Sequence, residues 1–295
     1  ELVDDAGGSV RFTENELFVS TRQAFDEWAN ADPDDETETG AFRHEQFYRW
    51  MRRESGVLVD GDDPVGGAWN YDDENQEFPP AEWDAPSVPE HDYDPVVVET
   101  AEWVAETFDT WGSTDLSDFH WPVTRQQACE HLRHFVTDRL PEFGPYQDAM
   151  RDDDWAMAHA LLGSSINLGL LHPVEVIEEI ETAYEDRDLP LNSVEGCIRQ
   201  ILGWREFMRH VYRHAMPELA TANQLDAEHD LPELYWSGET DMACLAGTVE
   251  DVHERGYAHH IQRLMILANF ATLWGVEPSE LNEWFHATYV DAYHW

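Results

Sequence analysis

Beyond residue 95, apolar residues recur at the three- and four-residue spacing of helices that bury one face. The clearest stretch follows Asn192 and Glu195, whose spacing resembles a capping box at the start of a helix. A helical period then continues until Pro217 through the apolar positions Ile198, Ile201, Leu202, Met208, Val211 and Tyr212. The pattern predicts one long helix here.

Three further helices are expected in the same part of the chain. The first begins at Pro173, because proline is favoured in the first turn of a helix. The second runs over 257–274 and ends at Gly275, and the third begins at Pro278. We therefore expect residues 96–295 to form an all-α domain without internal repeats.

The first 95 residues have a mixed pattern. Short β-like runs at 17–20 and 57–59 lie on either side of a helical pattern over 42–53, which predicts mixed α/β structure. From Asp60 to Pro95 the chain is rich in Asp, Pro and Gly, which is typical of a long surface connector. The expected organisation is an α/β segment with its connector over 1–95, followed by the helical domain.

Composition indicates a folded protein with an unusual surface. Among 295 residues, 42% are hydrophobic and thirteen are tryptophan, which is more apolar surface than a disordered acidic chain carries. The formal net charge is -45, from 62 acidic and 17 basic residues, and every basic residue is arginine. Such a surface suits a halophilic protein, since the Debye length falls to roughly 3 Å in molar salt and carboxylate repulsion is then screened.

The charge also bears on partners. A net anion repels a phosphate backbone, and salt weakens nucleic-acid binding further. The local field at a binding face matters more than the total, however, and one expected helix is locally basic. It carries Arg199, Arg205, Arg209 and Arg213, with His210 and His214. A nucleic-acid partner is therefore not excluded.

The three cysteines, Cys129, Cys197 and Cys244, form no CxxC pair and have no zinc-like spacing, which excludes a disulfide framework. No apolar run of eighteen residues and no secretory leader occur, which favours the cytoplasm and indicates no membrane partner. The sequence begins without methionine and ends at Trp295 inside an apparent helix, so we expect a piece of a longer protein.

The strongest local signal is the segment Tyr257-Ala-His-His-Ile-Gln-Arg-Leu-Met265. On a helix, His260 lies at the margin of an apolar face, and His259 shares an adjoining face with Arg263; the apolar face comprises Tyr257, Ile261, Leu264, Met265 and Ala268. Histidines beside a buried cleft suit general-acid chemistry, because imidazole titrates near neutral pH. Two hydrogen-bonded structural histidines explain the same spacing, so both interpretations stay open.

A second signal is the arginine row at 205, 209 and 213, which follows Trp204. Guanidinium groups bind phosphate through two hydrogen bonds, and an indole face stacks on flat rings, so a flavin or nucleic-acid site is one interpretation. Ion pairs with the many nearby carboxylates are the other. The residues alone do not decide between them.

Two weaker signals complete the set. The stretch from His159 to Gly169 contains small and hydroxyl residues, which let a backbone turn approach phosphate but more often cap a helix. Several aromatic residues, usually core filler, are also suited to electron hopping towards a redox cofactor; they are Trp236, Trp274, Trp284, Phe285 and Tyr289. These aromatic residues become candidates for electron transfer only if a redox cofactor is assigned.

Eight segments, in this order, resemble the prokaryotic (6-4) photolyases, the iron-sulfur branch of the photolyase and cryptochrome superfamily. The segments are Phe47-Tyr-Arg with Met51-Arg, Pro64-Val-Gly-Gly-Ala-Trp-Asn, Phe143-Gly-Pro-Tyr-Gln-Asp-Ala-Met150, Asn167-Leu-Gly-Leu-Leu-His-Pro173, Glu195-Gly-Cys-Ile-Arg-Gln-Ile-Leu-Gly-Trp-Arg-Glu-Phe207, Tyr235-Trp-Ser-Gly with Met242-Ala-Cys244, Tyr257 to Met265, and Tyr289-Val-Asp-Ala. Each is modest in specificity, and together they span nearly the whole chain.

The resemblance implies a fold and a cofactor. The expected fold is the remnant of a Rossmann-type α/β antenna domain, followed by a mainly all-α domain that encloses a bent FAD and receives a flipped-out DNA lesion. The residues that fall where the family wraps FAD are Tyr146, His159, Gly163, Ser164, Trp204 and Arg205. Arg263 and Asp291 match an arginine and aspartate that pair beside the flavin ring.

The same resemblance implies roles for the remaining candidates. His259 and His260 match the histidines that face the lesion, one of them the proton donor. Trp236 and Trp284 match electron-transfer aromatics, while Phe285 stands where some relatives have tyrosine and so lacks a phenol proton. The implied partner is UV-damaged DNA, with no obligate protein partner.

Cys244 matches the first of four cysteines that hold a [4Fe-4S] cluster. One thiolate cannot hold such a cluster, and the other three are expected beyond Trp295. The family also suggests a ribityl-lumazine antenna pigment. Cofactor loading of this chain alone is therefore in question.

Three hypotheses follow. The first is light-driven repair of pyrimidine-pyrimidone (6-4) lesions by electron transfer from reduced FAD, which the pair His259–His260 favours. The second is a cryptochrome-type photoreceptor without repair activity. The third is a flavin-free helical iron-sulfur module that binds nucleic acid. The set Trp204, Arg205, Arg263 and Asp291 argues against this third hypothesis, because it favours a bound flavin.

Overall fold

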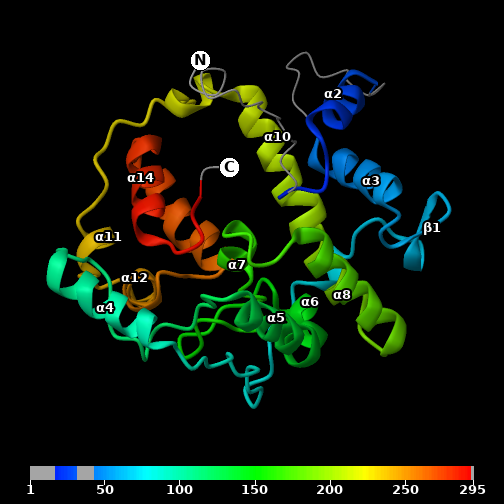
Figure 1. The fold of residues 1–295 in the computed structure, drawn as a ribbon. Helices are drawn as coiled ribbons and strands as arrows, with labels where there is room; N and C mark the ends of the chain where they lie inside the picture. The colour runs from blue at the N-terminus through cyan, green and yellow to red at the C-terminus, as the bar shows by residue number, and fades with distance from the viewer. Residues whose placement is uncertain (1–16, 32–42, 294–295) are drawn as a thin grey trace, which may run out of the picture.

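The computed structural model describes residues 17–31 and 43–293 and shows a mainly helical protein (Figure 1). The α-helices are α2 (Arg22–Ala31), α3 (His44–Ser55), α4 (Pro95–Thr107), α5 (Arg125–His134), α6 (Leu140–Tyr146), α7 (Gly163–Asn167), α8 (Pro173–Asp186), α9 (Leu191–Ile198), α10 (Glu206–Ala215), α11 (Leu234–Ser237), α12 (Ala243–Arg255), α13 (Asn269–Trp274) and α14 (Pro278–Thr288). Wider π-helical turns are η3 (Phe135–Arg139), η4 (Arg199–Arg205) and η6 (Gln262–Ala268). Short 3-10 turns are η1 (Val65–Gly67), η2 (Asp72–Glu74) and η5 (Glu218–Thr221).

The expected Rossmann-type remnant is not confirmed. Within the described residues, the only sheet is an antiparallel pair of β1 (Val59–Asp60) and β2 (Asp63–Pro64), and a Rossmann-type domain is built on parallel strands. The run 17–20 forms bends rather than the expected strand, because Glu206 of α10 takes up its backbone N–H groups. The helix expected over 42–53 is confirmed from His44, and Phe42 lies outside the described residues.

The long helix expected before Pro217 is present as the continuous series α9, η4 and α10. The capping box predicted at its start is wrong, because α9 begins at Leu191 and Asn192 already lies in the first turn. The Asn192 amide donates instead to Asn75 Oδ1 over 3.0 Å. Glu195 is fully buried, accepts a hydrogen bond from the backbone N–H of Tyr71 and pairs with Arg199.

The helices opened by proline are confirmed. His172 caps α8 by accepting the N–H of Val174, and Glu277 caps α14 in the same way through Ser279. The helix expected over 257–274 begins only at His260. Most of its first part is the π-helical segment η6, whose extra residue per turn rotates the faces that follow.

That rotation makes one predicted apolar face wrong. Leu264 and Met265 are predicted to be buried, but 50% and 54% of their surfaces are exposed. Tyr257 and Ile261 are buried as expected, although Tyr257 precedes the helix rather than lying on it. The apparent helix at Trp295 falls outside the described residues, and α14 ends at Thr288.

The described residues form two main hydrophobic cores. The larger one joins α2, α3 and α5–α10 around Phe47, Leu140 and Leu202. The smaller one joins α11–α14 around Trp284 and Leu267. A third, small cluster links them, and its buried members are Trp121, Ala156, Leu161 and Tyr257. Helix α3 packs on η4 in the larger core, and the domain boundary near residue 95 stays a prediction.

The close crossing of α6 and α9 requires a residue without a Cβ at position 144. A Cβ added at Gly144 would lie 2.7 Å from the backbone nitrogen of Ser193, and the Gly144 N–H donates to Ser193 Oγ. We expect Gly144→Ala to lower the free energy of unfolding by about 1–3 kcal/mol, because a backbone clash cannot be relieved by a rotamer change.

The matched control is Gly247→Ala, since an added Cβ there meets nothing within 4 Å inside α12. This change is expected to stabilise by about 0.5–1 kcal/mol through helix propensity. Urea denaturation of both variants measures the difference. Equal midpoints for the two variants would contradict the steric argument.

Candidate functional site

A buried arginine shapes the loop that leads into α7. Arg139 of η3 is fully buried and donates to five backbone carbonyl oxygens, those of Pro86, Ser87, Ala156, Met157 and His159, over 2.7–3.2 Å. The loop contains Met157 and Leu161, both with positive φ, a conformation that side chains with a Cβ seldom adopt. The arginine therefore fixes a strained loop and places His159 at its end.

The loop meets the C-terminal helices at an ion pair. Arg263 donates to both carboxylate oxygens of Asp291 over 3.0 and 2.9 Å, as the family resemblance implied. The Arg263 guanidinium also lies over the rings of Tyr257 and Tyr289. Gly163 lies directly beside the pair, because a Cβ added there would stand 3.2 Å from Asp291 Oδ2.

Histidines complete the cluster. The rings of His159 and His259 lie tilted against each other with centroids 4.6 Å apart, and both side chains are buried. We call the group His159, Gly163, Ser164, His259, Arg263 and Asp291 the junction site. It lies where the loop 155–163, the start of η6 and the segment after α14 meet.

The junction site holds polar atoms that the described residues leave without partners. His159 Nε2, Ser164 Oγ and both ring nitrogens of His259 are buried and make no hydrogen bond there. Buried polar atoms almost always have a partner, from protein, water or ligand. Their concentration beside one ion pair makes the junction site the candidate site for a polar ligand.

Burial decides the charge of these histidines. Burial lowers the pKa of His259 to about 3, helped by nearby Arg263, and it lowers the pKa of His159 well below its usual range. Both rings are therefore neutral near neutral pH. His260 is exposed, and its pKa is also lowered by surrounding atoms, but the carboxylate of Asp148 opposes that shift. His260 is therefore the better placed of the neighbouring pair to carry a proton.

The structure does not bring every predicted flavin residue to this site. Trp204 stacks on the His44 ring with centroids 3.8 Å apart and is 43% exposed. Tyr146, at the end of α6, meets the edge of Trp83. Among the described residues no contact joins Trp204 to Arg263 or Asp291, so the single flavin cavity that the resemblance implies for these residues is not confirmed.

The arginine row binds the chain itself. Arg205 donates to the Leu17 carbonyl and lies over the Phe18 ring, and Arg209 donates to the Ser20 carbonyl. Arg213 pairs with Asp26 of α2. Ion pairing with nearby carboxylates, one of the two interpretations of this row, is present at Arg213 with Asp26 and at Arg205 with Glu206, whereas the contact of Arg209 is to a backbone carbonyl.

Sequence reasoning missed the buried cluster that anchors this segment. Ser20 Oγ donates to Glu206 and lies 2.7 Å from His210 Nε2, while the His210 ring stacks on Phe25. Glu206 contacts the serine rather than the histidine, so the arrangement is a structural clamp and not a nucleophile–base pair. Residue types spaced by about 190 positions gave no local signal for it.

The aromatic candidates form one assembly in the smaller core. Trp284 is fully buried and touches Phe285 and Tyr289 with ring centroids 5.3 and 5.7 Å apart. Trp236 lies nearer the surface and is 39% exposed. Trp111, absent from the sequence prediction, contacts both Trp236 and Trp284.

Cys244 is exposed in the first turn of α12. Cys197 is buried in the larger core and Cys129 packs against it, so neither belongs to the helices around Cys244. A [4Fe-4S] cluster needs four ligands and therefore does not fit the thiols of this chain alone. Among the described residues no group of three metal-ligating side chains is found.

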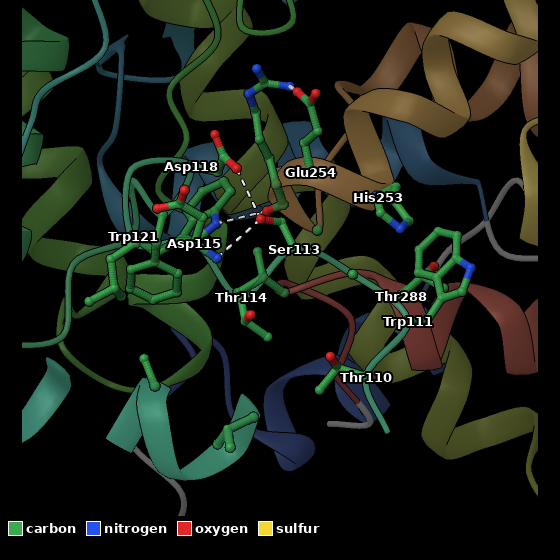
Figure 2. Close-up of a pocket in the computed structure, with 18 of the residues that line it drawn as sticks. Thr110, Trp111, Ser113, Thr114, Asp115, Asp118, Trp121, His253, Glu254 and Thr288 are labelled. Carbon is green, nitrogen blue, oxygen red and sulfur yellow. Dashed lines mark hydrogen bonds and ion pairs between the residues drawn. The ribbon is translucent and has the colours of Figure 1, made fainter. Parts of the chain in front are cut away.

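A pocket of about 710 Å³ borders the junction site through Tyr289, whose ring lies against Arg263, but no residue of the junction site lines it. It is enclosed by α4, the loop 110–123, the end of α12 and residues 287–290, and none of the residues predicted for the flavin lines it. Figure 2 shows Trp111, His253 and Thr288 at one end and Trp121 at the other. Ser113 lies between them and donates to Asp118.

None of the described helices has the length and apolar composition needed to cross a bilayer.

Buried histidines should make the fold sensitive to acid. His131 is fully buried, its ring nitrogens have no partner among the described residues, and burial together with nearby His91 and Arg139 lowers its pKa to about 3. In the unfolded chain His131 binds a proton below about pH 6.5, whereas in the folded chain it stays neutral down to about pH 3. The contribution of the neutral His131 to the free energy of unfolding is therefore fully present above about pH 6.5. It is lost as the pH falls towards about 3, by up to about 1.4 kcal/mol per pH unit for each such histidine.

We expect His131→Leu to flatten this dependence. Urea midpoints at about pH 7 and about pH 5 measure it, and the variant should lose less stability between them than the parent chain. An equal loss in both proteins would show that His131 does not contribute.

Solved structures with known folds match this architecture. A bacterial class III photolyase from Agrobacterium tumefaciens aligns over 99% of this chain and 54% of its own, with a TM-score of 0.62 and 20% identity. A cryptochrome from Synechocystis sp. aligns over 58% of this chain and 36% of its own, with a TM-score of 0.53 and 19% identity. The described helices thus have the photolyase and cryptochrome fold.

Sequence comparison identifies the family of the chain. A (6-4) photolyase from Agrobacterium fabrum is 40% identical over 290 residues, which is 98% of this chain and 55% of that protein. An uncharacterized protein of Acanthamoeba polyphaga mimivirus is 30% identical over 98 residues, 33% of this chain and 74% of that protein. The family model of deoxyribodipyrimidine photo-lyase-related proteins matches residues 1–121. The chain belongs to this photolyase-related family and spans about half the length of the photolyase that it resembles.

Proposed function

We propose that the protein of which this chain is a part repairs (6-4) pyrimidine photoproducts in DNA with light. The observation that carries the proposal is the 40% identity to a (6-4) photolyase over 98% of the chain. The junction site supports it, because an arginine–carboxylate pair stands beside buried histidine and serine atoms that have no partner among the described residues.

FAD is the cofactor that we propose for the junction site. Ser164, His159 and His259 offer unpartnered hydrogen-bonding atoms, and Gly163, which has no Cβ, lets the Asp291 carboxylate pack closely against the start of α7. Reduced FAD, when bound and excited, supplies the electron for repair. Arg263 would offer its positive charge, and its pairing with Asp291 fixes the direction of that charge. Flavin contacts of Tyr146, Trp204 and Arg205 stay predictions.

His260 is the proposed proton donor to the lesion, and His259 its buried neighbour. A neutral His259 carries one ring N–H that it would offer to a bound ligand, since its lowered pKa keeps it from carrying charge. Exposed His260 can exchange protons with solvent near Asp148. The DNA partner would meet this face locally, because a chain with net charge -45 repels DNA elsewhere.

The test is His260→Ala in the flavin-loaded, full-length protein. We expect loss of light-dependent repair of an oligonucleotide that carries one (6-4) lesion, by about 100-fold or more if the side chain is the general acid. The flavin absorption spectrum should be unchanged. Exposed His229→Ala is the control and should repair normally. Retained repair in His260→Ala would refute the proposed role.

A photoreceptor without repair activity is the second candidate, favoured by the likeness to a cryptochrome fold. The same assay separates the two, since a photoreceptor reduces its flavin in light and leaves the lesion intact. A [4Fe-4S] cluster at Cys244 is proposed only with three further thiolates from outside this sequence. A ribityl-lumazine antenna likewise remains a proposal from the family.

A further inference from the structure

Aromatic rings connect the junction site to the protein surface. The Tyr289 ring lies 4.3 Å beneath the Arg263 guanidinium, and its centroid is 5.7 Å from that of Trp284. Trp284 is fully buried, and its indole N–H donates to the Tyr235 carbonyl. Trp284 is therefore the point at which a chain of rings from the site enters the smaller core.

Two chains of rings lead outward from Trp284. One passes through Tyr235 and Phe270 to Trp274, with centroid distances of 5.2, 6.4 and 5.9 Å. The other passes through Trp111 to Trp236, with distances of 6.4 and 5.9 Å. Both end at a half-exposed tryptophan, because Trp274 is 53% and Trp236 39% exposed.

The two chains differ in chemistry. The first contains Phe270, whose benzene ring is far harder to oxidise than an indole. It also contains Tyr235, whose phenol donates to the Leu267 carbonyl, a group that cannot take its proton. The second consists of indoles alone. Its middle ring, Trp111, is held by a hydrogen bond from Nε1 to the Trp236 carbonyl over 2.7 Å and by edge contacts with His253 and Trp284.

We propose that Trp111 is the intermediate site through which one electron passes between Trp236 and Trp284, and that the route through Phe270 is closed. This assignment rests on the proposed flavin function for its biological use. When an excited, oxidised flavin takes one electron from Trp284, Trp111 gives an electron to Trp284 and becomes the radical cation. Trp236 then reduces Trp111 and releases its indole proton to water. A thiol in solution reduces the neutral Trp236 radical by giving a hydrogen atom and becomes a thiyl radical.

Cys244 provides a handle to test the route without flavin. It is exposed at the start of α12, which packs against the helix α11 that carries Trp236. A ruthenium polypyridyl complex attached to this thiol, in a Cys129→Ser background, can be oxidised by a laser flash and then withdraws an electron from the nearest indole. Cys197 is buried and stays unlabelled.

Transient absorption of the tryptophan radical, with ascorbate as a water-soluble reductant, is the measurement. In the parent chain we expect a fast phase from exposed Trp236 and a slow phase from buried Trp284, which ascorbate does not reach. Trp111→Phe should lose the slow phase and keep the fast one. Trp284→Phe should also lose the slow phase, and Trp274→Phe should change neither.

A slow phase that persists unchanged in Trp111→Phe would overturn the assignment, as would its loss in Trp274→Phe. Trp111→Leu is the second variant, because an aliphatic side chain also removes the oxidisable indole. Circular dichroism confirms folding of each variant. Because the experiment uses no flavin, failure here leaves the repair proposal intact, and failure of repair leaves the route testable.

Discussion

Replacing Arg139 by leucine is expected to destabilise the protein by about 4 kcal/mol or more, far beyond the loss expected from substituting an exposed arginine. The substitution leaves five buried carbonyl oxygens without their shared donor, and each such loss typically costs about 1–3 kcal/mol before relaxation. Burial lowers the pKa of Arg139 to about 10, so the guanidinium is still charged at neutral pH and its hydrogen bonds are charge-assisted.

The measurement is the free energy of unfolding in urea, with near-ultraviolet circular dichroism as the probe of tertiary packing. Arg133→Leu is the matched control, because Arg133 lies in α5 on the exposed side, and it should stay within about 0.5 kcal/mol of the parent. Arg139→Lys should fall between the two, since an ammonium cannot reach five carbonyls at once. Similar midpoints for Arg139→Leu and Arg133→Leu would disprove the role of Arg139.

Asp291→Asn is expected to cost about 3 kcal/mol and to abolish ligand binding at the junction site. The change leaves Arg263 with its charge between two tyrosine rings and the Ala258 carbonyl, without a counter-charge. The amide of asparagine also turns a donor towards a cation. Loss of flavin from the purified protein and a lower urea midpoint are the two readouts.

An exposed pair of the same geometry provides the control. Arg151 donates to both oxygens of Asp153, whose side chain is 69% exposed. Asp153→Asn should cost at most about 1 kcal/mol, because water screens the pair. The double change Arg263→Met with Asp291→Leu should recover part of the stability but none of the binding. Equal costs at Asp291 and Asp153 would contradict a special role for the partly buried pair of Arg263 and Asp291.

The sequence predicted helices well where neighbours in the chain decide them. Pro173 and Pro278 open α8 and α14, because the fixed φ of proline suits a first turn and needs no distant contact. The apolar period before Pro217 likewise produced one continuous helical run. The ends of elements were predicted less well. Asn192 is not the N-cap, because Pro190 takes that position and α9 begins at Leu191, before Asn192.

The candidate site was predicted in part. The roles of Arg263, Asp291, Gly163 and His159 came from family resemblance. The structure shows the pairing of Arg263 with Asp291 and the close approach of Gly163 to Asp291, while His159 contacts His259. Trp204 and Arg205 carry the same resemblance but contact His44 and the segment 17–18. The residue types gave no means of knowing which partner each would meet.

What the sequence determined by itself is the helical character, the acidic surface and the residue types available for chemistry, since these depend on composition and on spacing within a few residues. Only the tertiary structure decided that Arg139 orders the loop before α7, that the π-helical η6 turns Leu264 to solvent, and that Trp111 bridges Trp236 and Trp284. The contacts of Arg139 and Trp111 join groups that packing brings together from 17 to 173 positions apart in the chain, and no local pattern encodes such a contact.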